Sequence, residues 1–140
     1  MEALAWEMGW KRGIELGLGH GLLFARFLAL GIDMIGVDLG LRPERRKAVE
    51  ALEGGTVHWM ATGEAAALVP DGWADFVFVD AAHSYRAVQM DIRQWLPKVR
   101  VGGWFGGHDY HAKFPGVIQA VHEAFGIPDM LPGFIWARPC

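Results

Sequence analysis

The sequence predicts a single α/β domain, a three-layer α/β/α sandwich around a mostly parallel sheet. Short apolar runs alternate along the chain with longer stretches of helical period, which is the order of parallel strands joined by crossover helices. The 140 residues, 52% of them hydrophobic, suffice for one compact core and are too few for two ordinary domains. We therefore expect one domain over residues 1–140.

Three apolar runs in the first half of the chain are expected to be buried strands: 13–17, 33–40 and 56–60. The segment 21–31 between the first two reads as a helix that ends at a glycine. Residues 42–55 predict a second helix, because a proline suits its first turn and a glycine its end. A short helix is expected over 63–69.

The second half of the chain continues this alternation. Residues 74–80, ADFVFVD, form the clearest strand of the sequence, and 84–99 has a helical stripe of apolar residues that a serine can cap. A fifth strand is expected over 102–107, and a helix that starts at a proline over 115–125. Two short apolar pieces divided by Pro-Gly predict a hairpin over 129–139.

Composition narrows the classes of function. The formal net charge is −3 and the 13 basic residues are thinly spread apart from RPERRK, which disfavours nucleic acid as a main partner. The single cysteine, Cys140, permits no intrachain disulfide, so a reducing, cytoplasmic location is expected. No signal-peptide pattern is visible and no apolar run approaches ~20 residues, so we expect a soluble protein that does not bind membranes.

A glycine-rich loop follows the first expected strand. In ELGLGHG, the residues Gly17, Gly19 and Gly21 stand between a strand and a helix, where glycines allow a tight turn and a close approach of a ligand to the backbone. A dinucleotide fingerprint would place its third glycine at position 22, which is Leu22 here. The loop therefore fits a pyrophosphate poorly, and a turn without any ligand remains the alternative.

Two acidic residues near this loop favour a particular cofactor. Asp38 ends the second strand, where a carboxylate can accept hydrogen bonds from both hydroxyls of a ribose, a sugar that NAD and S-adenosylmethionine share. Glu15 adds negative charge that would repel the phosphates of a dinucleotide and attract a sulfonium or amino group. Together they favour S-adenosylmethionine over NAD.

Four segments together resemble one family: IELGLGHG, GVDLG, VDAAHSYRAVQMDIRQWLPKVRVGGWFGGHDY and FPGVIQAV. They are similar to class I S-adenosylmethionine-dependent methyltransferases, in particular to a small O-methyltransferase-like group with an HSY…GHDY signature. The resemblance implies a Rossmann-like sheet of seven strands with an antiparallel last strand, and methyl transfer to a hydroxyl of a small-molecule acceptor. The residues then expected to bind the cofactor are Glu15, Gly17, Gly19, Gly21, Asp38, Gly63, Glu64 and Asp80.

Two polar clusters follow the fourth and fifth strands, Asp80 with His83 and His108 with Asp109. Neighbouring parallel strands lie ~5 Å apart, so these side chains are expected to converge. The resemblance places the methyl group beside Asp80, and it makes His83 and His108 the candidate bases for a hydroxyl acceptor. Some related O-methyltransferases hold a divalent ion here, which implies Asp80 and Asp109 as ligands of magnesium. His108 stands where an oxygen ligand is common, which favours a histidine base.

Other interpretations stay open. The strand-end residues can have purely structural roles, and the small size supports a non-catalytic interaction subunit with the same fold. An NAD-dependent oxidoreductase is a further alternative, against which Leu22 argues. The chain has no lid insertion between its fifth and sixth strands, so the acceptor site would be shallow or completed by a second copy, and we expect a homodimer. Sugars, phenols and small polyketide-like hydroxyls all remain possible acceptors.

Overall fold

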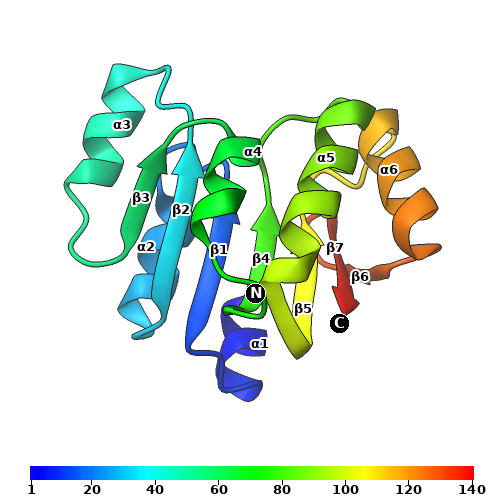
Figure 1. Ribbon diagram of the computed structural model, residues 1–140, viewed down its shortest axis with the longest axis horizontal. Coiled ribbons are helices and arrows are strands. Elements are labelled where there is room, and N and C mark those ends of the chain that lie inside the picture. The colour runs from blue at the N-terminus through cyan, green and yellow to red at the C-terminus, as the bar shows by residue number, and fades with distance from the viewer.

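The computed structural model describes residues 1–140, apart from the side chain of Glu2, and is built around a seven-stranded sheet (Figure 1). The strands are β1 (Arg12–Leu16), β2 (Asp33–Asp38), β3 (Thr56–Trp59), β4 (Ala74–Val79), β5 (Val99–Gly107), β6 (Asp129–Leu131) and β7 (Ile135–Pro139). Their order is β3-β2-β1-β4-β5-β7-β6, with β1 to β5 parallel and β7 antiparallel to both of its neighbours. The predicted fold class is confirmed.

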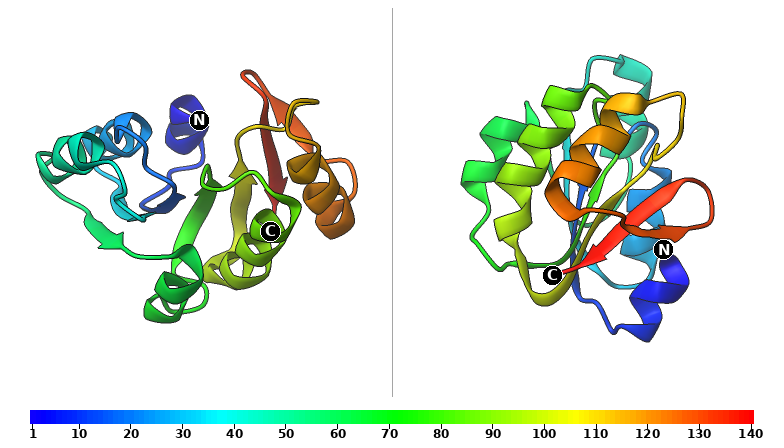
Figure 2. Two further views of the ribbon diagram at one scale, coloured as in Figure 1. Left: turned by 90° about the horizontal axis from the view of Figure 1, so that it is seen from above. Right: turned by 90° about the vertical axis from the view of Figure 1, so that its right-hand side faces the viewer.

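Helices cover both faces of the sheet. They are α1 (Glu2–Glu7), α2 (Leu22–Ala29), α3 (Pro43–Glu50), α4 (Thr62–Ala65), α5 (Tyr85–Trp95) and α6 (Pro115–Phe125). The first three lie on one face and the last three on the other, which gives the expected three layers (Figure 2). Within the described part of the chain, no helix is both long and apolar enough to cross a membrane.

Each face of the sheet has its own apolar layer. Phe24 and Phe27 of α2 pack on Phe76 of β4, and Trp10 stacks on the same ring with centroids 4.6 Å apart. On the opposite face, Trp95 and Trp136 are fully buried. Burial of one such side chain stabilises the fold by roughly 1.5–3 kcal/mol. The aromatic residues that the composition suggested for the core therefore hold the helices against the sheet.

Two elements differ from the sequence-based expectation. Helix α1 was not predicted, because its six residues carry neither a side-chain cap nor a long apolar stripe. Strand β5 begins earlier than expected, at Val99, and its register against β4 shifts between Ala74 and Phe76. Gly103 allows this shift, since a Cβ there would lie 2.5 Å from the carbonyl oxygen of Asp75.

The parallel strands bring their carboxyl ends to one edge of the sheet. The register pairs Leu16 of β1 with Val79 of β4, and Val79 with Gly107 of β5. Glu15, Asp80 and His108 therefore come close together although they are distant in the sequence. This edge carries the candidate site.

Candidate functional site

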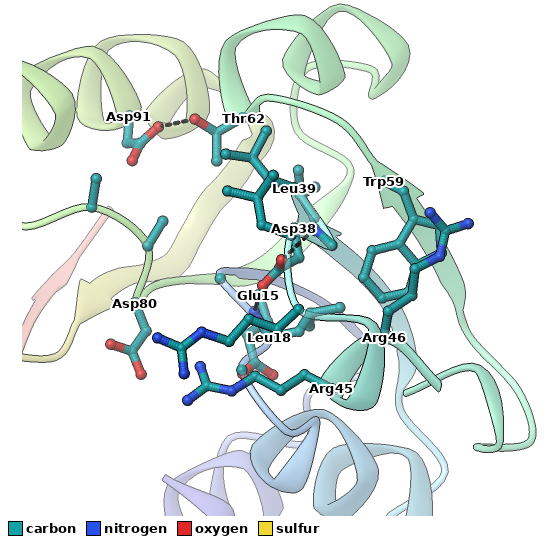
Figure 3. Close-up of a pocket in the computed structure, with 18 of the residues that line it drawn as sticks. Glu15, Leu18, Asp38, Leu39, Arg45, Arg46, Trp59, Thr62, Asp80 and Asp91 are labelled. Carbon is teal, nitrogen blue, oxygen red and sulfur yellow. Dashed lines mark hydrogen bonds between the residues drawn. The ribbon is translucent and has the colours of Figure 1, made fainter. Parts of the chain in front are cut away.

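A cavity of about 830 Å³ opens at the carboxyl edge of the sheet. Its lining comes from the glycine-rich loop, the ends of β2, β3 and β4, and helices α3 and α5 (Figure 3). Small-molecule sites usually measure about 300–1,000 Å³ and lie at this edge of open α/β sheets. The cavity thus has the size and the place of a ligand site.

The glycine-rich loop forms one wall of the cavity. Gly17 has a φ of 85°, and a Cβ on it would lie 2.1 Å from the carbonyl oxygen of Asp80, so only glycine lets the loop pass so close to the end of β4. A Cβ on Gly19, by contrast, would meet nothing within 4 Å, and this residue lines the cavity. Gly21 is the N-cap of α2, next to Val49 of α3. Gly17 and Gly21 therefore serve packing, and Gly19 leaves backbone open to a ligand.

Glu15 is the most unusual residue of the cavity. It is 3% exposed, and within the described part of the chain its Oε2 atom is buried without a hydrogen-bond partner. Burial raises the pKa of this carboxyl well above its usual value, and the nearby Asp80 and Asp38 raise it further. A buried polar group without a partner costs about 1–3 kcal/mol. A positively charged ligand group in the cavity would offset this cost.

Asp38 stands at the end of β2 and is held by two backbone donors. Its Oδ2 accepts a hydrogen bond from the Leu18 N–H at 2.9 Å, and its Oδ1 accepts one from the Gly40 N–H at 2.7 Å. Each carboxylate oxygen can accept a further hydrogen bond. The carboxylate is therefore fixed in position and has capacity for two hydroxyl groups, as a ribose requires.

Asp91 and Thr62 face the cavity at the end beyond Asp38 and Leu39 (Figure 3). The Thr62 hydroxyl donates a hydrogen bond to Asp91 Oδ1 at 2.6 Å, and Asp91 is 3% exposed. Burial raises the pKa of Asp91, and the hydrogen bond from Thr62 counteracts this rise. No functional role was predicted for this residue. The available signal was an acidic residue on the buried stripe of α5, directly before Ile92.

Arginines of the basic run RPERRK lie at the cavity mouth, although this run was not expected to belong to the site. Arg42, Arg45 and Arg46 all line the cavity. The Arg46 guanidinium lies over the Trp59 ring, 4.9 Å from its centroid, and forms an ion pair with Glu50. Figure 3 shows Arg45 extending from α3 across the cavity. These side chains bring positive charge to a cavity whose acidic residues are Glu15, Asp38, Asp80, Asp91 and Asp109.

The residues after β4 and β5 converge as predicted. Asp109 contacts both histidines, with its Oδ2 2.5 Å from His83 Nε2 and its Oδ1 3.1 Å from His108 Nδ1. His108 Nδ1 lies 4.0 Å from Asp80 Oδ1. Asp109 has a φ of 61°, a left-handed backbone conformation with a strain of roughly 1–3 kcal/mol that is typical of functional sites.

The four residues of this cluster differ in what they face. Asp80, His83 and Asp109 line the large cavity, whereas His108 lines only a small adjoining pocket, to which Asp80 and His83 also contribute. Burial raises the pKa of Asp80 to about 6, with His108 lowering it, Asp109 raising it and His83 lowering it. The cavity therefore favours His83 over His108 as the imidazole that meets a ligand.

The same three residues could hold a metal ion. One ligand atom each of Asp80, His83 and Asp109 lies within 4.8 Å of the others. This donor set includes an imidazole, so it differs from the all-oxygen set that magnesium prefers and suits manganese, iron or zinc better. His108, which stands in the sequence where an oxygen ligand of the metal is common, is not one of these three residues.

Gly63 and Glu64, two of the residues expected to bind a cofactor, lie near the cavity but face elsewhere. Gly63 packs against the side chain of Gln94, and Glu64 is exposed. Thr62, directly before them, lines the cavity. Contacts of Gly63 and Glu64 with a cofactor stay a prediction.

Comparison with known proteins gives a family match and several structural neighbours. A family model described as a methyltransferase domain matches residues 14–110, and no curated protein sequence matches the chain. The TDP-rhamnose 3'-O-methyltransferase CalS11 of calicheamicin biosynthesis has a TM-score of 0.76 at 12% identity, over 99% of this chain and 77% of its own. A putative caffeoyl-CoA O-methyltransferase from Staphylococcus aureus has a TM-score of 0.73 at 12% identity, over 97% and 78% of the two chains.

A third neighbour was solved with a ligand. It is an O-methyltransferase from Bacillus cereus in complex with SAH, with a TM-score of 0.69 at 14% identity, over 99% of this chain and 78% of its own. Identities this low show likeness of fold alone. The family match covers the glycine-rich loop, Asp38 and both polar clusters.

Proposed function

Because the chain belongs to the methyltransferase domain family, we propose that it transfers a methyl group from S-adenosylmethionine to a hydroxyl of a small-molecule acceptor. The observation that carries this proposal is Glu15, a buried carboxyl that lacks a partner in the described part of the chain and faces the cavity. S-adenosylmethionine carries two positive groups, a sulfonium and an ammonium. Either group would supply the positively charged partner that the Glu15 carboxyl lacks among the described residues.

The remaining cavity residues support the same cofactor. The fixed carboxylate of Asp38 matches a ribose, and the open side of Gly19 leaves room for the chain that joins ribose to the methionine group. The methyl group then lies between the ends of β1 and β4, next to Asp80 and His83. The structural neighbour from Bacillus cereus that holds SAH supports this cofactor class.

Methyl transfer is an in-line displacement at carbon. The acceptor oxygen forms a bond to the methyl carbon while the carbon–sulfur bond breaks, and its electrons return to sulfur as a neutral thioether. The acceptor must also lose its hydroxyl proton. Proximity and alignment supply most of the rate, and a positioned base contributes typically 10²–10⁴-fold.

His83 is the proposed base. A carboxylate only accepts hydrogen bonds, so the contact of His83 Nε2 with Asp109 Oδ2 places the proton on Nε2 and leaves Nδ1 free to take one. The ring is held further by Phe114, on which it stacks with centroids 4.5 Å apart. Asp109 thus fixes the tautomer and the orientation of the imidazole. It also stabilises the positive charge that forms when His83 takes the acceptor's proton.

A metal-assisted route is the second candidate, supported by the convergence of Asp80, His83 and Asp109. A divalent cation bound by these three residues would polarise the acceptor hydroxyl and ease the loss of its proton. Chelation separates the two routes, because transfer by a histidine base is insensitive to EDTA. Loss of activity in EDTA with recovery in manganese or magnesium would favour the metal.

The proposed function is tested first by binding and then by transfer. Calorimetry with S-adenosylmethionine and S-adenosylhomocysteine should show binding of both, and NAD serves as the matched negative ligand. A panel of sugars, nucleotide sugars, phenols and catechols is then followed by mass spectrometry for methylated products. Failure of both adenosyl ligands to bind at millimolar concentration would overturn the proposal. Binding without transfer to any acceptor would favour the non-catalytic subunit.

A further inference from the structure

Two arginines at the mouth of the cavity have no partner for their charge in the described part of the chain. Arg42 and Arg45 stand three positions apart at the start of α3, and both line the cavity. Neither guanidinium forms an ion pair, a hydrogen bond or a ring contact with a described residue. The neighbouring Arg46 differs, because it pairs with Glu50 and lies over the Trp59 ring. Arg42 and Arg45 therefore keep their full capacity to bind an anion.

Arg45 is directed into the cavity rather than out to solvent. This residue is half-buried, whereas Arg42 and Arg46 are exposed. In Figure 3 its side chain runs from α3 across the cavity, in the direction of Asp80 in that view. A half-buried guanidinium gives up part of its hydration, and here no counter-ion among the described residues compensates for that loss. An anion bound in the cavity would supply the missing counter-ion.

The acidic residues of the cavity do not neutralise these arginines. Among the described residues, no carboxylate lies within ion-pair distance of either guanidinium. The cations that lower the pKa of Asp80 are His108 and His83, and burial and two neighbouring acids raise the pKa of Glu15. The cavity thus keeps its charges apart, with carboxylates at the strand ends and guanidinium groups on α3. Ligands that fill it bring positive charge to the first region and negative charge to the second.

The cofactor of the proposed reaction meets only the first of these needs. S-adenosylmethionine has a single negative group, a carboxylate bonded to the same carbon as its ammonium. Attraction of that ammonium to the acids holds this end of the cofactor at the strand ends. The cavity, at about 830 Å³, is near the upper end of the usual range of about 300–1,000 Å³, so it has room for an acceptor beside the cofactor. The negative charge is therefore expected on the acceptor.

From this arrangement we infer that the acceptor carries a phosphate group, which Arg45 and Arg42 bind at the mouth of the cavity. The inference rests on the proposed function, because it concerns the acceptor of the methyl group. A planar guanidinium presents paired N–H donors that match phosphate oxygens. Two such groups suit a phosphate, with its charge of roughly −2, better than a singly charged carboxylate. A phosphomonoester and a diphosphate share this chemistry. The phosphate positions the acceptor and takes no part in the transfer.

The test uses four ligands that share a glucose ring and differ in charge. Glucose, glucose 6-phosphate, glucuronate and UDP-glucose are titrated by calorimetry into the wild-type protein saturated with S-adenosylhomocysteine, in about 50 mM salt to limit screening. Uridine is the control for the base of UDP-glucose. We expect at least one phosphorylated ligand to bind about 10- to 100-fold more tightly than glucose and glucuronate. Preference for glucose 6-phosphate identifies a phosphomonoester, and preference for UDP-glucose identifies a diphosphate.

Arg45→Met is the main variant, because methionine keeps an apolar stem and removes the guanidinium. It should weaken binding of the preferred phosphorylated ligand about 10-fold or more, and change the affinity for S-adenosylhomocysteine by less than about threefold. Arg45→Lys, which keeps the charge but not the paired donors, should show an intermediate loss. Arg42→Met provides a second variant if Arg45→Met does not fold. Lys47→Met is the matched control, with the same change of charge on α3 at an exposed residue outside the cavity lining.

The outcomes separate the acceptor from the cofactor. Equal binding of all four ligands to the wild type, or unchanged binding in both Arg45→Met and Arg42→Met, would overturn the inference and leave the proposed function intact. Tighter binding of glucuronate than of both phosphorylated ligands would contradict a phosphate. Equal losses of S-adenosylhomocysteine and of the phosphorylated ligand in Arg45→Met would assign this arginine to the cofactor and also overturn the inference. Absence of S-adenosylhomocysteine binding by the wild type would overturn the proposed function itself, and the inference with it.

Discussion

Replacement of Glu15 by glutamine is expected to stabilise the ligand-free protein and to weaken cofactor binding. The carboxyl is buried, and its Oε2 has no partner in the described part of the chain. Glutamine keeps the shape of the side chain and removes the charge that burial, Asp80 and Asp38 all disfavour. The same charge is what a sulfonium or ammonium group would use. Stability and binding should therefore change in opposite directions.

The two effects differ in their origin. Glutamine also leaves a buried polar atom without a partner, so the gain in the free energy of unfolding at pH 8 comes from removal of the buried charge and not from a satisfied hydrogen bond. Loss of a charge-assisted hydrogen bond to the cofactor weakens binding by about 1.5–3 kcal/mol. At about 1.4 kcal/mol per factor of ten, the dissociation constant should rise roughly 10- to 100-fold.

The difference in stability between the wild type and Glu15→Gln should depend on pH, and the direction of this dependence can be measured. Because the pKa of Glu15 in the folded protein lies above its ordinary value of 4.5, the folded state keeps a proton that the unfolded chain has already released. The wild type then loses stability as pH rises from 4.5 toward the folded-state pKa, and the loss is complete above it. Glu15→Gln lacks this loss, so its advantage over the wild type should grow with pH.

Urea denaturation of both proteins at pH 5, 6, 7 and 8 measures the first effect, and calorimetry measures the second. S-adenosylmethionine and S-adenosylhomocysteine share the ammonium and differ in the sulfonium, so unequal losses identify the group that Glu15 meets. Glu53→Gln, at an exposed glutamate, is the control and should change neither quantity. A Glu15→Gln protein no more stable than the wild type at pH 8 would refute the reasoning from burial.

Three further predictions concern the two ends of β4 and the end of β2. Asp80→Asn should abolish methyl transfer. It should also stabilise the protein more at pH 8 than at pH 5, because the pKa of the Asp80 carboxyl, about 6, lies above the usual 3.8. Equal gains in the free energy of unfolding at both pH values would contradict this. Asp38→Asn should weaken binding of S-adenosylhomocysteine but not of methionine, which has no ribose, as calorimetry can show. Asp75→Asn should destabilise the fold by about 1–3 kcal/mol in urea, since its carboxylate accepts hydrogen bonds from Lys11, Arg12 and Arg100, while Asp71→Asn should have no such effect.

The local pattern of apolar and polar residues was sufficient to predict most of the fold. The runs that became β1, β2 and β4 are apolar because both faces of a central parallel strand are covered, and all six residues of β4 are buried. Helix α1 could not be predicted in this way, because its position depends on packing of Ala5 and Trp10 against the sheet rather than on its own sequence. The start of β5 likewise depends on a register shift against β4, which no local pattern encodes.

The part of the site that lies at the ends of the strands could be predicted from the sequence. Asp80, His83, His108 and Asp109 meet because β4 and β5 are neighbours, and the strand order followed from the resemblance. Asp91 was not predictable as part of the site, since its partner Thr62 lies 29 positions away and the pair forms only when α4 and α5 pack together. The arginines of α3 appeared as an ordinary basic run because nothing local places them at a cavity mouth.

The carboxylates at the two ends of the sheet show which part of the molecule is built for stability and which for a ligand. Asp75, at the start of β4, is buried, but hydrogen bonds from Arg100, Lys11 and Arg12 outweigh the effect of burial and lower its pKa. Asp80, directly after the same strand, has a raised pKa, as do Glu15 and Asp91. These three carboxyls line one cavity. Hydrogen bonds within the protein therefore satisfy the acid that lies away from the cavity, whereas the acids at the cavity keep capacity for hydrogen-bond donors and positive charge on a ligand. Binding of such a ligand should raise the free energy of unfolding more than binding of a purely apolar ligand in the same cavity.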